Sequence, residues 1–307
     1  MNLTLESKVL IQGFSEFISP THIAQMQAYG TNLVAGVNPG FGGQKIYNLP
    51  VFDLVEEVVA KLGQIDTTII CVQPYQVLDA ALEAIAANIP QIIIISAGVP
   101  PLDMVQLLRK TETRETLIIG PNSPGIIVPG KILLGTQPSE FYIPGSIGIV
   151  SRSSTLTYEV AWELTKMGLG QSISVSIGSD AIVGSSFLQW LQILDEDDTT
   201  QAIVLIGQPS GGSEEAAAKY ISEAIDKPVI AYIAGKHVPP VPTWQQTGTL
   251  ATIIGRSANF GTAESKLAAF KSANIPVADS PSQIPQLLNK ILIPASVDQE
   301  TRGKRVN

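Results

Sequence analysis

The stretch from Gln201 to Ala224 reads QAIVLIGQPSGGSEEAAAKYISEA and predicts a strand, a glycine-rich turn and a helix in direct succession. Residues 202–206 form an uninterrupted apolar run, the loop 207–212 follows, and a helical pattern begins directly after it. A strand that leads through such a turn into a helix N-terminus presents free backbone N–H groups to an anion. We therefore expect the functional site near this loop, with Gly211 and Gly212 facing a phosphate or carboxylate.

The same alternation of apolar strands and helices runs through both halves of the chain. In the first half we expect strands at 8–11, 32–37, 67–72, 91–96 and 116–119, and helices at 20–28, 53–62, 77–87 and 102–110. In the second half we expect strands at 147–151, 172–177, 202–206, 229–233 and 276–278, and helices at 155–167, 186–194, 213–224, 263–273 and 282–292. Such alternation indicates parallel sheets covered on both faces. It predicts an α/β protein with a Rossmann-like first domain and a flavodoxin-like second domain.

A segment rich in proline and glycine separates the two halves. Prolines and glycines interleave from Gly120 to Gly148, at a density that neither a helix nor a central strand tolerates. The length of 307 residues also suits two domains. We expect a first domain at 1–125, a linker at 126–146, a second domain at 147–293 and a loose tail at 294–307.

Charge and composition exclude several classes of function. The chain has 27 acidic and 19 basic residues and a net charge of −8, with only a short basic cluster at 302–305, so nucleic acid is not an expected partner. No apolar run approaches the ~20 residues that span a bilayer, and residues 1–8 do not resemble a signal peptide, so we expect no membrane association and a cytoplasmic location.

Two further residue types bear on the chemistry. The single cysteine, Cys71, lies in an apolar run, so we expect a buried core thiol. Histidine and cysteine spacings typical of zinc sites are absent, and we expect the acidic run 195–198 to be a solvated helix end. The sequence therefore predicts no metal site.

A second candidate anion site lies in the second half, where SRSST precedes an expected helix. Ser151, Ser153, Ser154 and Thr155 supply hydroxyl and N–H groups, and Arg152 supplies a guanidinium. The alternative is that Ser153 or Ser154 only caps the helix. Two helix N-termini of this kind in one domain favour an oxyanion or phosphate ligand.

In the first half, the loops that follow the expected strands are the places where a ligand would bind. These loops, 12–19, 38–43, 73–75, 97–101 and 120–125, would together line one crevice of nucleotide size. The first of them lacks the GxGxxG spacing and carries Glu16 where phosphates usually lie, so it is not a dinucleotide fingerprint.

Ordered motifs spread along the chain carry a resemblance to a known family. They are QGF at Gln12, AYGT at Ala28, PGFGG at Pro39, LPVF at Leu49, GVPPLDM at Gly98, GPNSPG at Gly120, GIVSRSSTLTYE at Gly148, IVLIGQPSGGSEEAA at Ile203, PVIAYIAG at Pro228 and GTAESK at Gly261. From about residue 8 to 290 the chain resembles the α subunit of succinate–CoA ligase, in the NDP-forming acyl-CoA synthetase superfamily.

The resemblance implies a fold, a ligand and a partner. It implies an N-terminal CoA-binding domain, a C-terminal ligase domain and a β subunit of ATP-grasp type, with Tyr158 near the junction of substrate and partner. The residues implied to contact CoA are Ser15, Pro39, Gly40, Ile95, Ser96 and Asn122.

The resemblance also implies a relay, which this chain has altered. In the family, ATP or GTP phosphorylates a histidine, the phosphoryl group passes to succinate, and CoA displaces it. The corresponding segment 243–251 reads TWQQTGTLA, with no histidine near Thr247, and Gln208 replaces the glutamate that pairs with that histidine. An amide cannot act as a carboxylate partner. We therefore expect no intact catalytic residue.

The CoA-binding motifs depart from the family pattern as well. Glu16 and Ser19 replace glycines of the first loop, Phe41 replaces a lysine, and Ala97 replaces a glutamate. Each change removes a close backbone approach or a charge-assisted contact. We expect CoA or nucleotide binding to be weakened or altered.

These observations predict an α-like ligase subunit with a degenerate relay, which acts as a CoA- or nucleotide-binding, regulatory or scaffolding subunit. It would pair with a β-type chain or with itself. The alternative is an active subunit of an NDP-forming acyl-CoA ligase, completed by a β-type partner or by His237. A third reading is a sensor of CoA or another nucleotide without a subunit partner.

Overall fold

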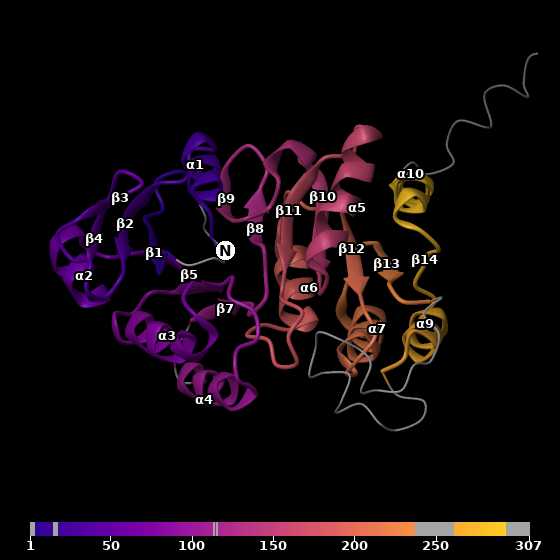
Figure 1. Cartoon of the computed structure of the whole chain (residues 1–307). Helices are drawn as coiled ribbons and strands as arrows, with labels where there is room; N and C mark the ends of the chain where they lie inside the picture. Colours follow the sequence, from indigo (N-terminus) through magenta and orange to yellow (C-terminus); the bar gives the residue numbers. More distant parts are fainter. Residues whose placement is uncertain (1–3, 15–17, 113, 115, 237–260, 293–307) are drawn as a thin grey trace, which may run out of the picture.

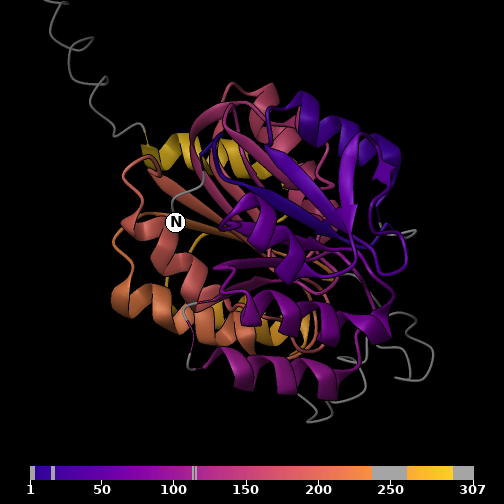
Figure 2. The same cartoon turned by 90° about the vertical axis from the view of Figure 1, so that its left-hand side faces the viewer.

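The computed structural model describes residues 4–14, 18–112, 114, 116–236 and 261–292, which form two seven-stranded sheets (Figures 1 and 2). The elements of the first half are β1 Val9–Gln12, α1 Pro20–Ala28, β2 Leu33–Val37, β3 Lys45–Ile46, β4 Leu49–Phe52, α2 Val55–Leu62, β5 Thr67–Ile70, α3 Val77–Ala86, β6 Gln91–Ile94, α4 Pro101–Thr111 and β7 Leu117–Ile119. The predicted strands and helices of this half are confirmed, with ends that differ by a residue or two.

The first sheet has the strand order β3-β4-β2-β1-β5-β6-β7, and all its neighbours are parallel except β3 and β4. Without β3 this is the Rossmann order, in which ligands bind between the first and fourth parallel strands, here β1 and β5. Gly13 follows β1 with φ +85°, and a Cβ there would lie 2.6 Å from Cγ1 of Val72, after β5. Glycine is therefore required where these two loops meet.

Helix α1 begins with a capping box formed by Ser19 and His22. The Ser19 Oγ accepts the His22 N–H, and His22 Nδ1 accepts the Ser19 N–H, both at 3.3 Å. Burial lowers the pKa of His22, which favours the neutral ring that can accept this bond. His22 therefore has a structural role.

The elements of the second half are β8 Gly125–Val128, β9 Ile132–Gly135, β10 Pro144–Ser151, α5 Ser154–Lys166, β11 Gln171–Ser176, α6 Phe187–Glu196, β12 Ala202–Gly207, α7 Ser213–Ala224, β13 Val229–Ile233, α9 Ala263–Ser272, β14 Val277–Ala278 and α10 Ile284–Leu292. Their strand order is β14-β13-β12-β10-β11-β8-β9. The five parallel strands follow the flavodoxin order, whose switch point lies between β10 and β12. Helices α5 and α10 lie on one side of this sheet and α6, α7 and α9 on the other (Figure 1).

The expectation that the segment 126–146 is a linker without helix or central strand is wrong, because it contains strands. Strands β8 and β9 form a hairpin that joins the second sheet antiparallel to β11. The hairpin tolerates the composition because the prolines fall at its ends and turn, and the glycines allow its strands to approach closely. A Cβ on Gly125 would lie 1.9 Å from the Leu134 carbonyl oxygen. The domain boundaries themselves stay a prediction.

The β8–β9 hairpin packs against the first half of the chain. The Thr31 hydroxyl donates to the Leu133 carbonyl at 2.6 Å, and the Gly130 N–H donates to the Tyr29 hydroxyl at 2.9 Å. One cluster of buried apolar side chains continues from β1 and α1 through the hairpin into the second sheet. The two sheets therefore share a core.

The structure bears on the expectations for Cys71 and for membrane-spanning helices. Cys71 is fully buried, and burial raises the pKa of its thiol, so the predicted core thiol is confirmed. Among the helices that the structure describes, none is long and apolar enough to cross a bilayer.

A buried ion cluster joins α9 to α7. Lys266 Nζ lies 2.5 Å from Glu214 and 3.0 Å from Glu215, and the side chains of Lys266 and Glu214 are fully buried. The same ammonium donates to the Gly211 carbonyl at 2.8 Å, so it also holds the loop before α7. Burial acts to raise the pKa of Glu215, but hydrogen bonds from Ser265 and Lys266 outweigh it and lower that pKa below 4.5.

We predict that Lys266→Met destabilises the chain by about 3–5 kcal/mol, because it leaves the buried carboxylate of Glu214 and the partly buried one of Glu215 without their cation. The matched control is Lys219→Met, which removes an exposed ammonium 3.9 Å from Glu223 and should change stability by less than about 0.5 kcal/mol. Urea unfolding at neutral pH measures both. Equal midpoints for the two variants would contradict the assigned role of Lys266.

Candidate functional site

The topology brings the two predicted anion loops together. They follow β10 and β12, the strands on either side of the switch point, and Ser151 is the register partner of Ile206. The Arg152 N–H donates to the Ile206 carbonyl at 3.0 Å. Helices α5 and α7 therefore begin beside each other at the carboxyl edge of the sheet.

Arg152 lies between these two helix starts. Its side chain is buried, Nη1 lies 3.4 Å from the Ser213 hydroxyl, and Nη2 donates to the Asp180 carbonyl at 2.9 Å. Within the described part of the chain its buried Nε has no acceptor. A buried donor without an acceptor is costly, so this geometry suits an anion ligand.

The hydroxyl groups before α5 mainly shape the backbone. The Ser151 Oγ accepts the Ser153 N–H and donates to the Ser153 carbonyl, both at 2.9 Å. The Ser153 Oγ caps the helix by accepting the Leu156 N–H at 3.4 Å. The N–H groups of Ser154 and Thr155 have no acceptor in the residues that the structure describes, so they are the donors left for a ligand.

Hydrogen bonds to α7 and to the residues before α9 fix the loop before α7. The Gln208 N–H donates to Glu214 Oε1 at 3.1 Å, and the Ser210 N–H donates to the Gly261 carbonyl at 2.7 Å. Gly211 has φ +61°, and a Cβ there would lie 3.9 Å from Arg152 Nη1. Gly212 is the residue directly before the helix. The loop thus brings Gly211 next to the buried guanidinium.

Sequence reasoning missed Asp180, Ser213, Glu214 and Lys266 as parts of this site. Asp180 lies in the loop after β11, at the same sheet edge as the two loops that were recognised. The rule that ligands bind beyond the carboxyl ends of strands would have pointed to it. The inward direction of Glu214 and Lys266 has no signal in the sequence, because charged residues on a helix are usually exposed.

In the first half, the loop after β2 does not offer its backbone to a phosphate. Pro39 and Gly40 are exposed, but the N–H groups of Gly40 and Gly42 both donate to Asp53 Oδ1, at 2.7 and 3.0 Å. A carboxylate therefore occupies the inside of this loop. Phe41, where the resemblance implies a lysine, is 45% exposed.

The other predicted CoA contacts lie at the ends of β6 and β7. Ser96 is buried and its hydroxyl donates to the Val72 carbonyl at 2.5 Å, while Ile95 is also buried. Asn122 follows β7, and its N–H donates to the Ser96 carbonyl at 2.9 Å. Ser96 and Ile95 thus support the crevice, whereas Asn122 lies partly exposed within it.

Several expected site residues cannot be placed. Ser15 and Glu16, His237, and the segment 243–251 with Thr247 all lie outside the described residues.

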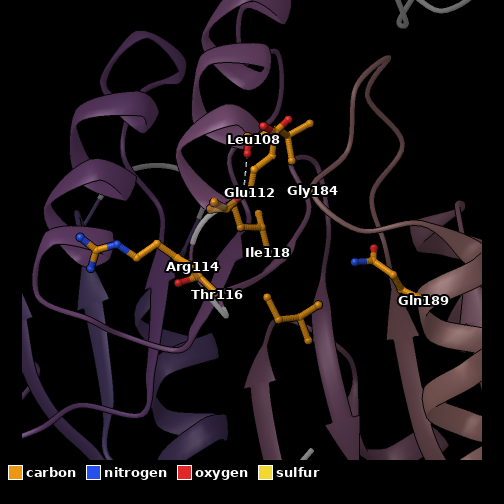
Figure 3. Close-up of a pocket in the computed structure, with 9 residues that line it drawn as sticks. Leu108, Glu112, Arg114, Thr116, Ile118, Gly184 and Gln189 are labelled. Carbon is orange, nitrogen blue, oxygen red and sulfur yellow. Dashed lines mark hydrogen bonds between the residues drawn. The ribbon is translucent and has the colours of Figure 1, made fainter.

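Two cavities lie away from these loops. One, of about 460 Å³, lies between α4, β7 and the residues Gly184 and Gln189 (Figure 3). The other, of about 500 Å³, lies between α2 and α3. Neither contains a residue that the sequence singled out.

Tyr158 belongs to an aromatic surface on α5. Its ring lies 6.0 Å from that of Phe141, which lies 5.3 Å from the ring of Trp162. Trp162 is 41% exposed and Met167, after the last turn of α5, is 57% exposed. Large apolar side chains grouped at a surface are typical of a contact with another chain.

Comparison with known protein families divides the chain into two matched regions. The family described as CoA binding domain matches residues 4–98, and the family described as CoA-ligase matches residues 150–283.

Curated relatives match almost the whole chain. The succinate–CoA ligase [ADP-forming] subunit alpha 2 of Archaeoglobus fulgidus is 41% identical over 286 residues, which are 93% of this chain and 97% of that protein. The corresponding alpha subunit of Aquifex aeolicus is 39% identical over 300 residues, which are 97% of this chain and 96% of that protein.

Solved structures show the same fold in larger proteins. An ATP citrate lyase from Methanosaeta concilii superimposes with a TM-score of 0.84 at 20% identity, over 96% of this chain. An acetyl-coenzyme A synthetase of Ca. Korarchaeum cryptofilum gives a TM-score of 0.67 at 20% identity, over 90% of this chain. The chain covers 52% and 58% of these proteins, so it spans a little over half their length.

The two matched domains, their order and the identity of about 40% over most of the chain agree with the motifs and the two sheets. This chain belongs to the family of succinate–CoA ligase alpha subunits.

Proposed function

We propose that this chain is an alpha-type ligase subunit that has kept the anion-binding shape of the site and lost its phosphoryl relay. It binds CoA or a related nucleotide and acts as a regulatory or scaffolding partner of an ATP-grasp β-type chain, in the cytoplasm. The observation that carries this proposal is Gln208, an amide in the loop beside the buried Arg152.

Neighbouring carboxylates do not replace the missing one. Glu214 is the acidic side chain bonded to the loop, but its oxygens accept from Lys266 Nζ, the Ser213 hydroxyl and the Gln208 N–H. Glu215 also accepts from Lys266. Both are therefore engaged in holding the loop, and neither is available to orient a histidine.

The segment 243–251 adds a second argument from sequence. It carries threonines but no histidine, and an unactivated hydroxyl is a poor phosphoryl carrier at neutral pH. Arg152, Ser154 and Thr155, the donors proposed for an anion, belong to a different part of the chain from that segment. Anion binding and phosphoryl transfer are therefore separable here.

Weak CoA binding is part of the proposal. The match to the CoA binding domain and the Rossmann order of the first sheet support a CoA-type ligand. Phe41 at the lysine position and the carboxylate of Asp53, bound inside the same loop, reduce the attraction for its phosphates.

The rival function is an active acyl-CoA ligase subunit, completed by a β-type partner or by His237. The relatives favour it, since they are called succinate–CoA ligase subunits. The two functions differ in whether a phosphoryl group becomes bound to this chain.

The first prediction is that the chain, incubated with labelled ATP and its co-expressed β-type partner, acquires no acid-labile phosphoryl adduct. The control variant introduces a glutamate and a histidine by Gln208→Glu together with Thr249→His, since Thr249 lies in the segment 243–251 where the resemblance implies the histidine. An adduct on the unaltered chain that disappears in His237→Ala would establish the rival function instead.

The second prediction concerns Phe41. Phe41→Lys should tighten CoA binding by about tenfold, since a charge-assisted contact is worth about 1.5–3 kcal/mol. Met167→Lys adds the same charge at an exposed site in the second half and should leave the affinity unchanged. Calorimetry with CoA up to millimolar concentration measures all three proteins, and a complete lack of binding by each would argue against the CoA-binding role.

The third prediction concerns the aromatic surface of α5 around Tyr158, where we propose that the β-type chain docks. Trp162→Lys should weaken the complex at least tenfold, because an exposed aromatic anchor contributes roughly 2 kcal/mol or more to an interface. Tyr75→Lys, at an aromatic residue that is 82% exposed in the first half, is the control. Unchanged co-purification of the Trp162 variant would refute this docking face, and self-association that is lost in the same variant would identify a homo-oligomer contact.

A further inference from the structure

The segment after β11, in the second half, is hydrogen-bonded to the loop after β7, in the first half, and we call this junction the seam. The Gly120 N–H donates to the Ile177 carbonyl at 3.3 Å, and the Gly184 N–H donates to the Gly120 carbonyl at 2.7 Å. Gly178 has φ +104°, and a Cβ there would lie 2.2 Å from the Pro121 carbonyl oxygen. The two backbones therefore meet without room for a side chain.

Asp180 lies at the centre of this seam, and its carboxylate holds two loops of the crevice. Oδ2 accepts the Gly98 N–H at 3.0 Å, and Oδ1 accepts the Asn122 side-chain amide at 2.9 Å. These loops follow β6 and β7, so one carboxylate from the second half connects two neighbouring strand ends of the first. Bonds to an ionised acceptor are roughly twice as strong as neutral ones.

The backbone of the same residue holds the anion site. The Asp180 carbonyl accepts from Arg152 Nη2 at 2.9 Å, and within the described residues it fixes the buried guanidinium together with the Ser213 hydroxyl, which lies 3.4 Å from Nη1. The position of this carbonyl depends on the segment that the carboxylate anchors. A shift of the loops after β6 and β7 would therefore move the acceptor of Arg152.

We infer that Asp180 is a positioning residue that couples ligand binding in the crevice to anion binding at Arg152. A ligand that orders Gly98 and Asn122 fixes the Asp180 carbonyl, and this leaves the guanidinium aligned for a phosphate. By linkage, a bound phosphate increases the affinity of the crevice for its ligand by the same factor. This inference deepens the proposed function and rests on it for the identity of the ligands.

The experiment is calorimetry on the full chain with inorganic phosphate, alone and with saturating CoA, for the wild type and Asp180→Asn. The asparagine keeps the side-chain size and the backbone carbonyl, but it removes the negative charge and places an NH2 group where one of the two carboxylate oxygens accepts a hydrogen bond. Asp66→Asn is the matched control, because Asp66 accepts the Lys8 N–H at 2.7 Å before β1, at the opposite end of that strand from the crevice.

We expect Asp180→Asn to weaken phosphate binding about tenfold and to abolish the effect of CoA on it. The sign is diagnostic, because removing a negative charge near an anion site would by itself tighten phosphate binding. Asp66→Asn should match the wild type in both measurements. Unchanged or tighter phosphate binding in Asp180→Asn, or a CoA effect equal to that of the wild type, would overturn the inference.

A second measurement decides the inference if the wild type binds neither ligand, which would refute the proposed function alone. Amide hydrogen exchange of the free protein should be faster in Asp180→Asn across 96–101, 120–125 and 151–156. A merely local role would raise exchange only near 178–184. Protection at 151–156 equal to that of the wild type would show that the coupling does not exist.

Discussion

The buried guanidinium of Arg152 is the group on which the site depends. It lies at the switch point of the second sheet, it contacts the start of α7 through Ser213, and it contacts the seam between the sheets through Asp180. A buried cation requires compensation, but in the described residues the Arg152 guanidinium donates only to two neutral oxygens, and the two helix N-termini beside it add positive partial charge. The site therefore favours the binding of an anion, whether or not phosphoryl transfer takes place there.

Two other features keep this arrangement in place. Lys266 neutralises the carboxylates beside the α7 loop and joins that loop to α9, so the loop shape does not rely on a ligand. The close backbone contacts at Gly120 and Gly178 fix the second half against the crevice of the first. Among the described residues, the contact that Gln208 makes in holding the loop uses its backbone N–H and not its side-chain amide. The proposed loss of the relay is therefore compatible with an unchanged architecture.

The sequence predicted most of the fold because parallel strands with continuous apolar runs and capped helices leave clear patterns. It failed between Gly120 and Gly148, since the glycines there permit close strand pairing, which looks like loop composition when read locally. For the site, the two helix starts were recognisable from loops after strands. The burial of Lys266 and the double role of Asp180 were not, because they depend on partners that are 52 and 82 residues away in sequence.

We infer that the site binds phosphate and forms no covalent bond to a phosphoryl group. The most direct measurement is ³¹P NMR of the chain with its β-type partner, ATP and inorganic phosphate in one sample. We expect the inorganic phosphate resonance to shift or broaden and no phosphoramidate resonance to appear. Arg152→Gln should remove the effect on the phosphate resonance. A phosphoramidate resonance, or a phosphate signal unaffected by the wild-type chain, would contradict this inference.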